Sequence, residues 1–138
     1  MTSDLANVIV VDSSVWIDYF SGRDSEQTDL LDALLVDGHV GITDVILLEV
    51  LQGFRHNKEH DEALNLLSSL TCFEIMDKQK ALRYVDYYRQ LRKKGITIRK
   101  SNDVMIAGYC IDHKLPLLFR DKDFLPFVQH LGLVSATD

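Results

Sequence analysis

The 138-residue chain has few of the residues that mark several common protein classes. It has two cysteines, Cys72 and Cys110, both in apolar surroundings and without a C-x-x-C spacing or a nearby histidine pair. This argues against a disulfide framework or a zinc site and predicts reduced core thiols. No apolar run approaches the roughly 20 residues of a membrane span, and the segment Met1–Asp4 lacks the basic residues of a signal peptide. We therefore expect one domain over residues 1–138, located in the cytoplasm and not in a membrane.

Positive charge is scarce in the first part of the chain. The formal net charge is −6, and residues 1–50 hold ten acids and one base, whereas residues 51–138 hold eleven acids and fourteen bases. A net acidic chain argues against general nucleic-acid binding. The uneven distribution is compatible with an acidic metal-binding pocket beside a cationic surface, although ordinary solvated faces would give the same counts.

What is present is organised around one apolar stretch, Val8–Val11, which is followed by Asp12. Four consecutive β-branched residues predict a short strand covered on both faces. Residues 15–20 then predict a helix capped by Ser13 or Ser14. Open α/β sheets bind ligands outside the carboxyl ends of their strands, so Asp12 lies at a position typical of functional residues. The plainer explanation of Asp12 is an ordinary helix N-cap.

Strand and helix patterns alternate along the rest of the chain. Strands are expected at 39–43, 71–76 and 115–119, with a weak edge strand at 131–134, and helices at 26–36, 44–51, 62–70, 77–94 and 101–113. This alternation predicts a three-layer α/β sandwich with a mainly parallel four- to five-stranded sheet. The helix over 77–94 is expected to bury the side formed by Ala81, Leu82, Val85, Tyr88 and Leu91.

Four more acids stand where strands end or on the helices that follow strands. Asp121 and Asp123 follow the strand at 115–119, Glu49 interrupts an apolar helix, and Asp103 lies in the first turn of its helix. Carboxylates gathered in one pocket repel one another, and a hard divalent cation such as Mg²⁺ or Mn²⁺ relieves this repulsion. Such a cation also supports the hydrolysis of a phosphodiester. Each acid also has a plainer explanation, as a cap, a partner of the helix dipole or a solvated side chain.

The order of these acids resembles the PIN-domain ribonucleases, and more closely the VapC-type toxins of toxin–antitoxin pairs. Four pieces carry the resemblance: VVDSSVWIDYF, TDVILLEVLQGFR, SNDVMIAGYC and LLFRDKDF. The resemblance implies a PIN-like fold and a Mg²⁺- or Mn²⁺-dependent endoribonuclease that cleaves structured RNA such as tRNA or rRNA. It also implies that Asp12, Glu49, Asp103 and Asp121 are the catalytic, metal-binding acids, with Asp123 as an additional metal ligand.

The same resemblance implies two protein partners, a VapB-type antitoxin and a second copy of the chain. The apolar residues Trp16, Tyr19 and Phe20 exceed what one small sheet face needs, so any exposed part of them is a candidate surface for either partner. A PIN-fold nuclease that acts on DNA, or in RNA processing without a toxin role, is the alternative. A phospho-acceptor receiver domain and an aspartate phosphatase are disfavoured, because Ser13 and Ser14 follow Asp12 where these classes need a second acid.

Basic residues cluster just before Asp103. Arg92, Lys93, Arg99 and Lys100 are expected to contact RNA phosphates, and Arg120 beside the fourth acid is expected to do the same. A solvated helix end explains the cluster equally well. Finally, Ser13 and Asn102 flank Asp12 and Asp103 and are candidates for orienting the ligands of a metal, with helix capping as the alternative.

Overall fold

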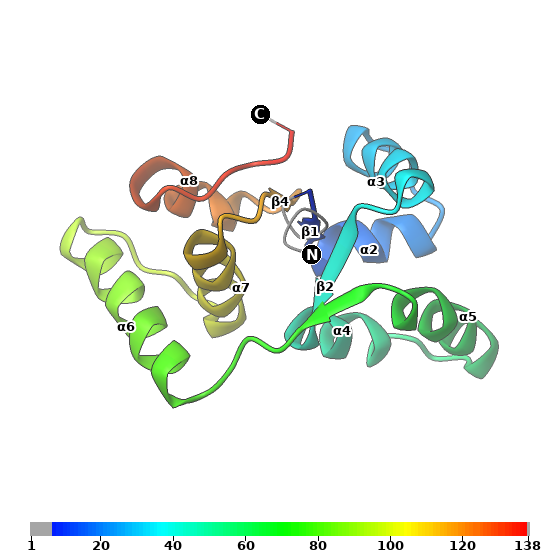
Figure 1. The fold of residues 1–138 in the computed structure, drawn as a ribbon, viewed down its shortest axis with the longest axis horizontal. Helices are drawn as coiled ribbons and strands as arrows, with labels where there is room; N and C mark the ends of the chain where they lie inside the picture. The colour runs from blue at the N-terminus through cyan, green and yellow to red at the C-terminus, as the bar shows by residue number, and fades with distance from the viewer. Residues whose placement is uncertain (1–6, 138) are drawn as a thin grey trace.

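The computed structural model describes residues 7–137, which form one parallel sheet flanked by helices (Figure 1). The strands are β1 (Ile9–Val11), β2 (Val40–Thr43), β3 (Thr71–Phe73) and β4 (Leu117–Leu118), paired in the order β3-β2-β1-β4. The helices are α2 (Ser13–Phe20), α3 (Glu26–Asp37), α4 (Asp44–Leu51), α5 (Asn57–Ser68), α6 (Lys78–Lys93), α7 (Ser101–His113) and α8 (Leu125–Leu131), with a short 3-10 helix η1 (Lys122–Phe124) before α8.

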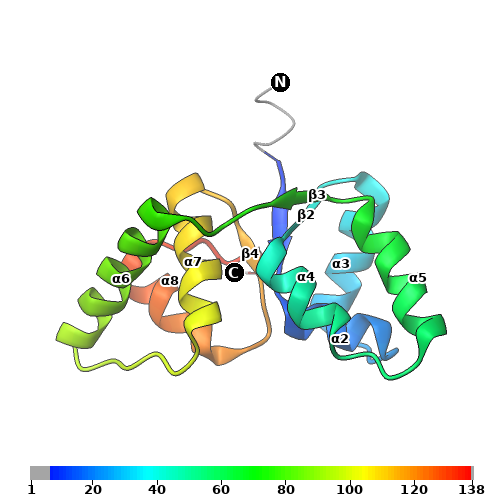
Figure 2. The same ribbon diagram turned by 90° about the horizontal axis from the view of Figure 1, so that it is seen from below.

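The helices cover both faces of the sheet. Helices α2, α3, α4 and α5 lie on one side, and α6, α7 and α8 lie on the other (Figures 1 and 2). The chain steps from β1 to β2 to β3 in one direction and then returns across the sheet to β4. Right-handed crossovers therefore place the two groups of helices on opposite faces. The predicted three-layer α/β sandwich with a parallel sheet is confirmed, with four strands in the described part of the chain.

Strand β1 is the buried centre of the sheet. Val10 and Val11 are fully buried, and β1 pairs with β2 on one side and with β4 on the other. The backbone N–H of Asp12 donates to the carbonyl of Leu118 at 2.9 Å, which fixes the end of β1 beside the end of β4. Because all four strands point the same way, the residues that follow them lie along one edge of the sheet.

Helix α7 is held closely against α6. A Cβ atom at Gly108 would lie 2.5 Å from Cδ1 of Tyr84, so glycine is what allows this approach. Tyr84 is itself buried, and its hydroxyl donates to the carbonyl of Ile75 at 2.7 Å. At the surface, Arg83 donates from Nε and Nη2 to the two carboxylate oxygens of Asp112 at 2.8 and 2.7 Å. The close approach of Gly108 to Tyr84 sets the position of α7, which carries Asp103 in its first turn.

Some expected element boundaries are wrong. The expected edge strand at 131–134 does not form, because α8 runs to Leu131 and the following segment makes one isolated parallel bridge, from Ser135 to Leu117. Helix α5 begins at Asn57, five residues before the expected start at Glu62, because its first turn is polar and gives no apolar pattern. Helix α7 is preceded by Lys100 at the N-cap position, without a side-chain cap from Ser101 or Asn102.

Two burial expectations are also wrong. Leu82 and Val85 of α6 are 62% and 53% exposed, because the apolar side of this helix is wider than the face that the neighbouring helices cover. Cys110 is buried as expected, but Cys72 on the edge strand β3 is exposed. Within residues 7–137, no helix is both long enough and apolar enough to cross a membrane.

Candidate metal centre

Five acidic residues belong to segments that follow the carboxyl ends of the strands. Asp12 directly follows β1, and Glu49 lies in α4, the helix that follows β2. Asp103 lies in the first turn of α7, which contacts both α4 and η1. Asp121 and Asp123 belong to the segment between β4 and α8. The topology thus brings together acids that are distributed over most of the chain.

Three of these acids form the centre of the site. Carboxylate oxygens of Asp103, Asp121 and Asp123 all lie within 4.8 Å of one another. Asp103 is buried, Asp121 is partly buried and Asp123 is exposed, so the group opens to solvent on one side. Asp121 also caps η1, since its Oδ1 accepts from the N–H of Asp123 at 2.9 Å. Its Oδ2 lies 3.8 Å from Nζ of Lys100.

Asp12 lies beside this group and caps α2. Its Oδ2 accepts from the N–H of Ser14 at 3.3 Å and from the Ser14 hydroxyl at 2.9 Å. Burial raises the pKa of Asp12 to about 6, and the charge of Glu49 adds to the shift, although the bonds from Ser14 oppose it. Capping is therefore observed, and it is Ser14 that contacts the carboxylate through its hydroxyl. Ser13, the predicted partner, is the first residue of α2.

Glu49 and Asn102 form a second pair at this edge. Nδ2 of Asn102 donates to Oε2 of Glu49 at 2.8 Å, which joins α4 to the start of α7. The predicted orienting role of Asn102 is consistent with this contact, and its side chain does not cap the helix. The other oxygen of Glu49, Oε1, is buried and has no hydrogen-bond partner among the described residues.

Asp103 is the most perturbed of these acids. Burial raises its pKa to about 7, and the charges of Asp12, Asp121 and Asp123 raise it further, while Lys100 opposes the shift. Its Oδ2 is buried without a hydrogen-bond partner in the described part of the chain. A buried carboxylate oxygen without a partner is energetically costly.

This donor set fits a divalent cation. Mg²⁺ and Mn²⁺ prefer carboxylate oxygens and keep several waters, which suits a group of three carboxylates that is open on one side. A cation there would also give the unpaired oxygen of Asp103 a partner. Asp12 and Glu49 are not part of the 4.8 Å group. The charge of Glu49 raises the pKa of Asp12, and the charge of Asp12 raises the pKa of Asp103.

One partly buried ion pair beside the site was not suggested by the sequence. Asp18 of α2 is 4% exposed, and Nε of Arg120 donates to its Oδ2 at 2.7 Å. Nη1 of Arg23 lies 3.9 Å from Oδ1 of the same carboxylate. Arg120, predicted to contact RNA, is thus bound to Asp18 through Nε. In the sequence Asp18 looks like a solvated helix residue, so the sequence pattern gave no signal for its pairing with Arg120.

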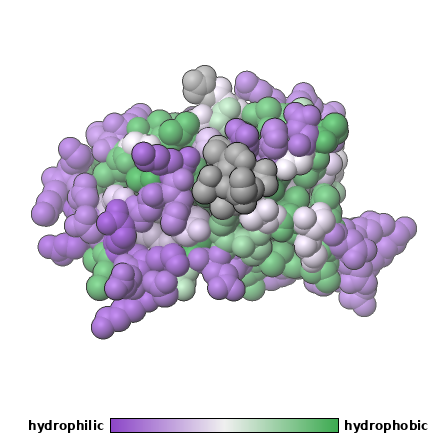
Figure 3. Space-filling model, in the orientation of Figure 1, coloured by the Kyte–Doolittle hydropathy of each residue, from purple (hydrophilic) through white to green (hydrophobic). Residues whose placement is uncertain are grey.

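The predicted basic residues extend from the site along the end of α6. Arg92, Lys93, Arg99 and Lys100 are all exposed. Hydrophilic side chains gather over the side of the molecule where α6 lies (Figure 3). A hollow of about 350 Å³ on α6 is lined by Tyr88, Arg89, Arg92 and Lys93, which places an aromatic ring among three cations.

Comparison with known proteins identifies the class of this fold. The model of the PIN domain family matches residues 9–127, and the chain belongs to that family. More particularly, the chain is 28% identical to the ribonuclease VapC11 of Mycobacterium tuberculosis over 132 residues, which cover 94% of this chain and 98% of the relative. The resemblance to the PIN domain and to the VapC ribonucleases is therefore confirmed.

Solved structures agree on the fold. VapBC2 from Rickettsia felis, bound to a DNA fragment from its promoter, matches with a TM-score of 0.73 at 18% identity, covering 93% of this chain and 96% of that one. A toxin–antitoxin complex from Klebsiella pneumoniae matches with a TM-score of 0.68 at 21% identity, covering 92% and 96%. At these identities the likeness concerns the fold.

Proposed function

We propose that this protein is a Mg²⁺- or Mn²⁺-dependent endoribonuclease that acts as the toxin of a toxin–antitoxin pair. The observation that carries the proposal is the group formed by Asp103, Asp121 and Asp123, whose oxygens lie within 4.8 Å of one another at the carboxyl edge of the sheet. Asp12 and Glu49 adjoin this group and complete the proposed catalytic set. The ribonuclease activity that names the VapC relatives supports RNA as the substrate.

In this proposal the carboxylates hold the divalent cation and orient the attacking water. A bound cation supplies Lewis acidity, which lowers the pKa of water and stabilises the charge that develops on the phosphate. The oxygen of water forms a bond to phosphorus and loses one proton, while one ester P–O bond breaks and its leaving oxygen gains one proton. This leaves a phosphomonoester on one RNA end and a hydroxyl on the other. Asn102 keeps Glu49 in place, and Ser14 keeps Asp12 in place.

The basic surface supports binding of the RNA strand. Residues 87–102 contain no acid, although the chain as a whole carries a net charge of −6. Lys100 stands at the border between the two regions, close to Asp121. We propose that phosphates on one side of the cleaved bond follow Arg99 and Lys100 toward Arg92 and Lys93, because cations beside an acidic metal site offset its repulsion of RNA.

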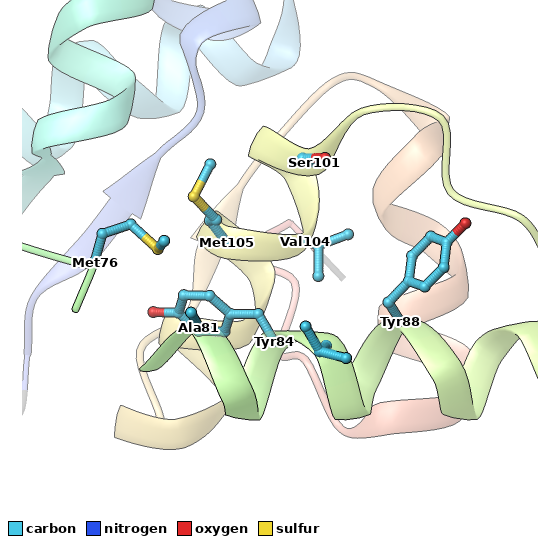
Figure 4. A pocket seen from close by; sticks show the side chains of 8 residues that line it. Met76, Ala81, Tyr84, Tyr88, Ser101, Val104 and Met105 are labelled. Atoms are coloured by element: carbon cyan, nitrogen blue, oxygen red, sulfur yellow. The ribbon is translucent and has the colours of Figure 1, made fainter. Parts of the chain in front are cut away.

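Partners and location follow from the same proposal. A VapB-type antitoxin would inhibit the enzyme in the cytoplasm, as the toxin–antitoxin complexes among the structural neighbours suggest. A second copy of the chain would cover the exposed apolar residues Met76, just before α6, and Leu82 and Val85, in the first half of α6. Met76 and Val85 also line an apolar pocket between α6 and α7, which Figure 4 shows.

The test is cleavage of defined RNAs by the purified protein. We expect cleavage of tRNA or rRNA with Mg²⁺ or Mn²⁺, and no cleavage by Asp12→Asn or in excess EDTA. Asparagine keeps the cap of α2, because its side-chain oxygen still accepts from Ser14. Full activity of the variant, or of the wild type in EDTA, would contradict the metal mechanism. Cleavage of DNA but not RNA would favour the alternative substrate.

The toxin role is tested separately in cells. We expect growth arrest on expression of the wild-type chain, relief by co-expression of the antitoxin, and normal growth with Asp12→Asn. Sequencing of RNA ends after brief induction then identifies the target. Harmless expression of an enzyme that is active in vitro would argue against the toxin role.

A further inference from the structure

The segment that carries Asp121 and Asp123 is attached to α2 by an ion pair. Arg120 directly precedes Asp121, and its Nε donates to Oδ2 of Asp18 at 2.7 Å across 102 positions of sequence. The Asp18 side chain is 6% exposed, whereas that of Arg120 is 48% exposed. The bond therefore joins the helix that begins at Asp12 to the segment that follows β4.

This segment is anchored in the core at its ends but not in its middle. Phe119 and Phe124 are 8% and 0% exposed, and their rings lie 5.3 Å apart. Between them, Asp121 and Asp123 must stay within 4.8 Å of Asp103, although like charges at this separation repel. A contact that keeps the backbone of residues 120–123 in place would oppose this repulsion.

We propose that Asp18 and Arg120 are positioning residues for the metal centre: their ion pair holds Asp121 and Asp123 beside Asp103 and so sets the affinity for the divalent cation. This role rests on the metal site of the proposed function. Residues that orient metal ligands typically change metal affinity by about 10–100-fold when they are replaced. The plainer explanation is that Arg120 only neutralises a buried aspartate, which would affect stability but not metal affinity.

The chain offers two matched controls. Arg23 also contacts the Asp18 carboxylate, at 3.9 Å, but it belongs to the turn after α2 and is not attached to the metal-binding segment. Arg83 forms an ion pair with both carboxylate oxygens of Asp112 between α6 and α7, away from that segment. Loss of either control pair removes an ion pair and leaves the attachment of residue 120 intact.

The experiment measures Mn²⁺ affinity of the full-length protein by calorimetry, with thermal unfolding in EDTA as the measure of stability. We expect Arg120→Gln and Asp18→Asn each to weaken Mn²⁺ binding at least about tenfold, the lower bound for such residues. The double variant should lose no more than either single variant, because both remove the same ion pair. Arg23→Gln and Arg83→Gln should bind Mn²⁺ within about twofold of the wild type, because the loss of Arg23 leaves the Asp18–Arg120 bond in place and Arg83 shares no partner with that pair.

Several results would overturn the positioning role. Mn²⁺ affinity equal to wild type in Arg120→Gln, with only a lower unfolding temperature, would make the pair merely structural. A higher KM for RNA in Arg120→Gln at unchanged Mn²⁺ affinity, and no effect of Asp18→Asn, would make Arg120 a direct phosphate contact. If Arg120→Gln does not fold, Arg120→Lys, which keeps the charge, and Asp18→Asn decide in its place. A wild-type protein that binds no Mn²⁺ would remove the metal site itself and with it this role.

Discussion

Replacing Asp103 by asparagine should stabilise the protein in the absence of divalent cations while abolishing its activity. Asp103 is buried, carries an oxygen that has no hydrogen-bond partner among residues 7–137, and stands among the charges of Asp12, Asp121 and Asp123. Burial first, and then these charges, raise its pKa from 3.8 to about 7. Asparagine has nearly the same shape, carries no charge, and can donate to the neighbouring carboxylates.

The sign and size of the effect follow from proton linkage. Because the pKa of Asp103 is higher in the folded protein than in the unfolded chain, the folded state binds this proton more tightly. This contribution to stability is fully present below the ordinary pKa of 3.8 and is lost as the pH rises through about 7. One pKa unit corresponds to about 1.4 kcal/mol, which gives ~4 kcal/mol over the whole window. Since the site opens to solvent at Asp123, we expect about half of this, ~2 kcal/mol.

Thermal unfolding in EDTA at pH 4, 6 and 8 checks the prediction. At pH 8 the unfolding temperature of Asp103→Asn should exceed that of the wild type by roughly 6–8 °C, for ~2 kcal/mol in a domain of this size. The difference should shrink toward zero at pH 4. Excess Mg²⁺ should stabilise the wild type much more than the variant. Asp24→Asn, which removes an exposed acid in the turn before α3, is the control and should show none of these changes.

An unfolding temperature of Asp103→Asn below that of the wild type at pH 8 would refute this reasoning. So would the same loss of stability between pH 4 and pH 8 in both proteins. Either result would mean that the carboxylate of Asp103 is stabilised in the folded protein without a cation, in which case its unpartnered oxygen would not indicate a binding site.

Three further predictions test other parts of the molecule. The double variant Arg92→Glu, Lys93→Glu should raise the KM for RNA with kcat little changed. The slope of log binding constant against log salt concentration should fall by about two units, and an unchanged slope would argue against phosphate contacts. Gly108→Ala should destabilise the protein by about 1–3 kcal/mol in denaturant unfolding, because its Cβ would lie 2.5 Å from Tyr84, and a stabilised variant would mean that the ring moves away at little cost. Ultracentrifugation should detect the proposed dimer of the wild type, and at the same concentrations Val85→Glu should be folded and monomeric; an unchanged dimer would place the interface elsewhere.

The parallel sheet was predictable from the sequence because local pattern and topology agree. The run Val8–Val11 has no polar residue that alternates out to water, which is the pattern of a strand covered on both sides, and Val10 and Val11 are fully buried. Several helix ends are marked by a local signal, such as the cap of α6 at Asp77 or the glycine after α3. Such signals depend on neighbouring residues and need no knowledge of distant contacts.

What could not be predicted depends on contacts between distant segments. The exposure of Leu82 and Val85 depends on how much of α6 the neighbouring helices cover. The apolar residues of a helix show in the sequence, but how many of them other helices will cover does not. The Asp18–Arg120 pair spans 102 positions and leaves no spacing pattern. The contact of Asn102 with Glu49 is equally distant, spanning 53 positions. The resemblance to a family named the acids of the site, but it did not say which of them lie closest together.

Asp12 shows why capping and metal binding should not be weighed as exclusive explanations. The bonds from Ser14 that cap α2 both go to Oδ2 of Asp12. In the same way Asp121 caps η1 through Oδ1 alone. A carboxylate has about four acceptor positions on its two oxygens, so a cap uses part of its capacity and fixes its orientation at the same time. A helix that begins directly after a parallel strand therefore needs an acceptor at the edge of the sheet where ligands bind, and an aspartate chosen for the cap is already placed to become a ligand.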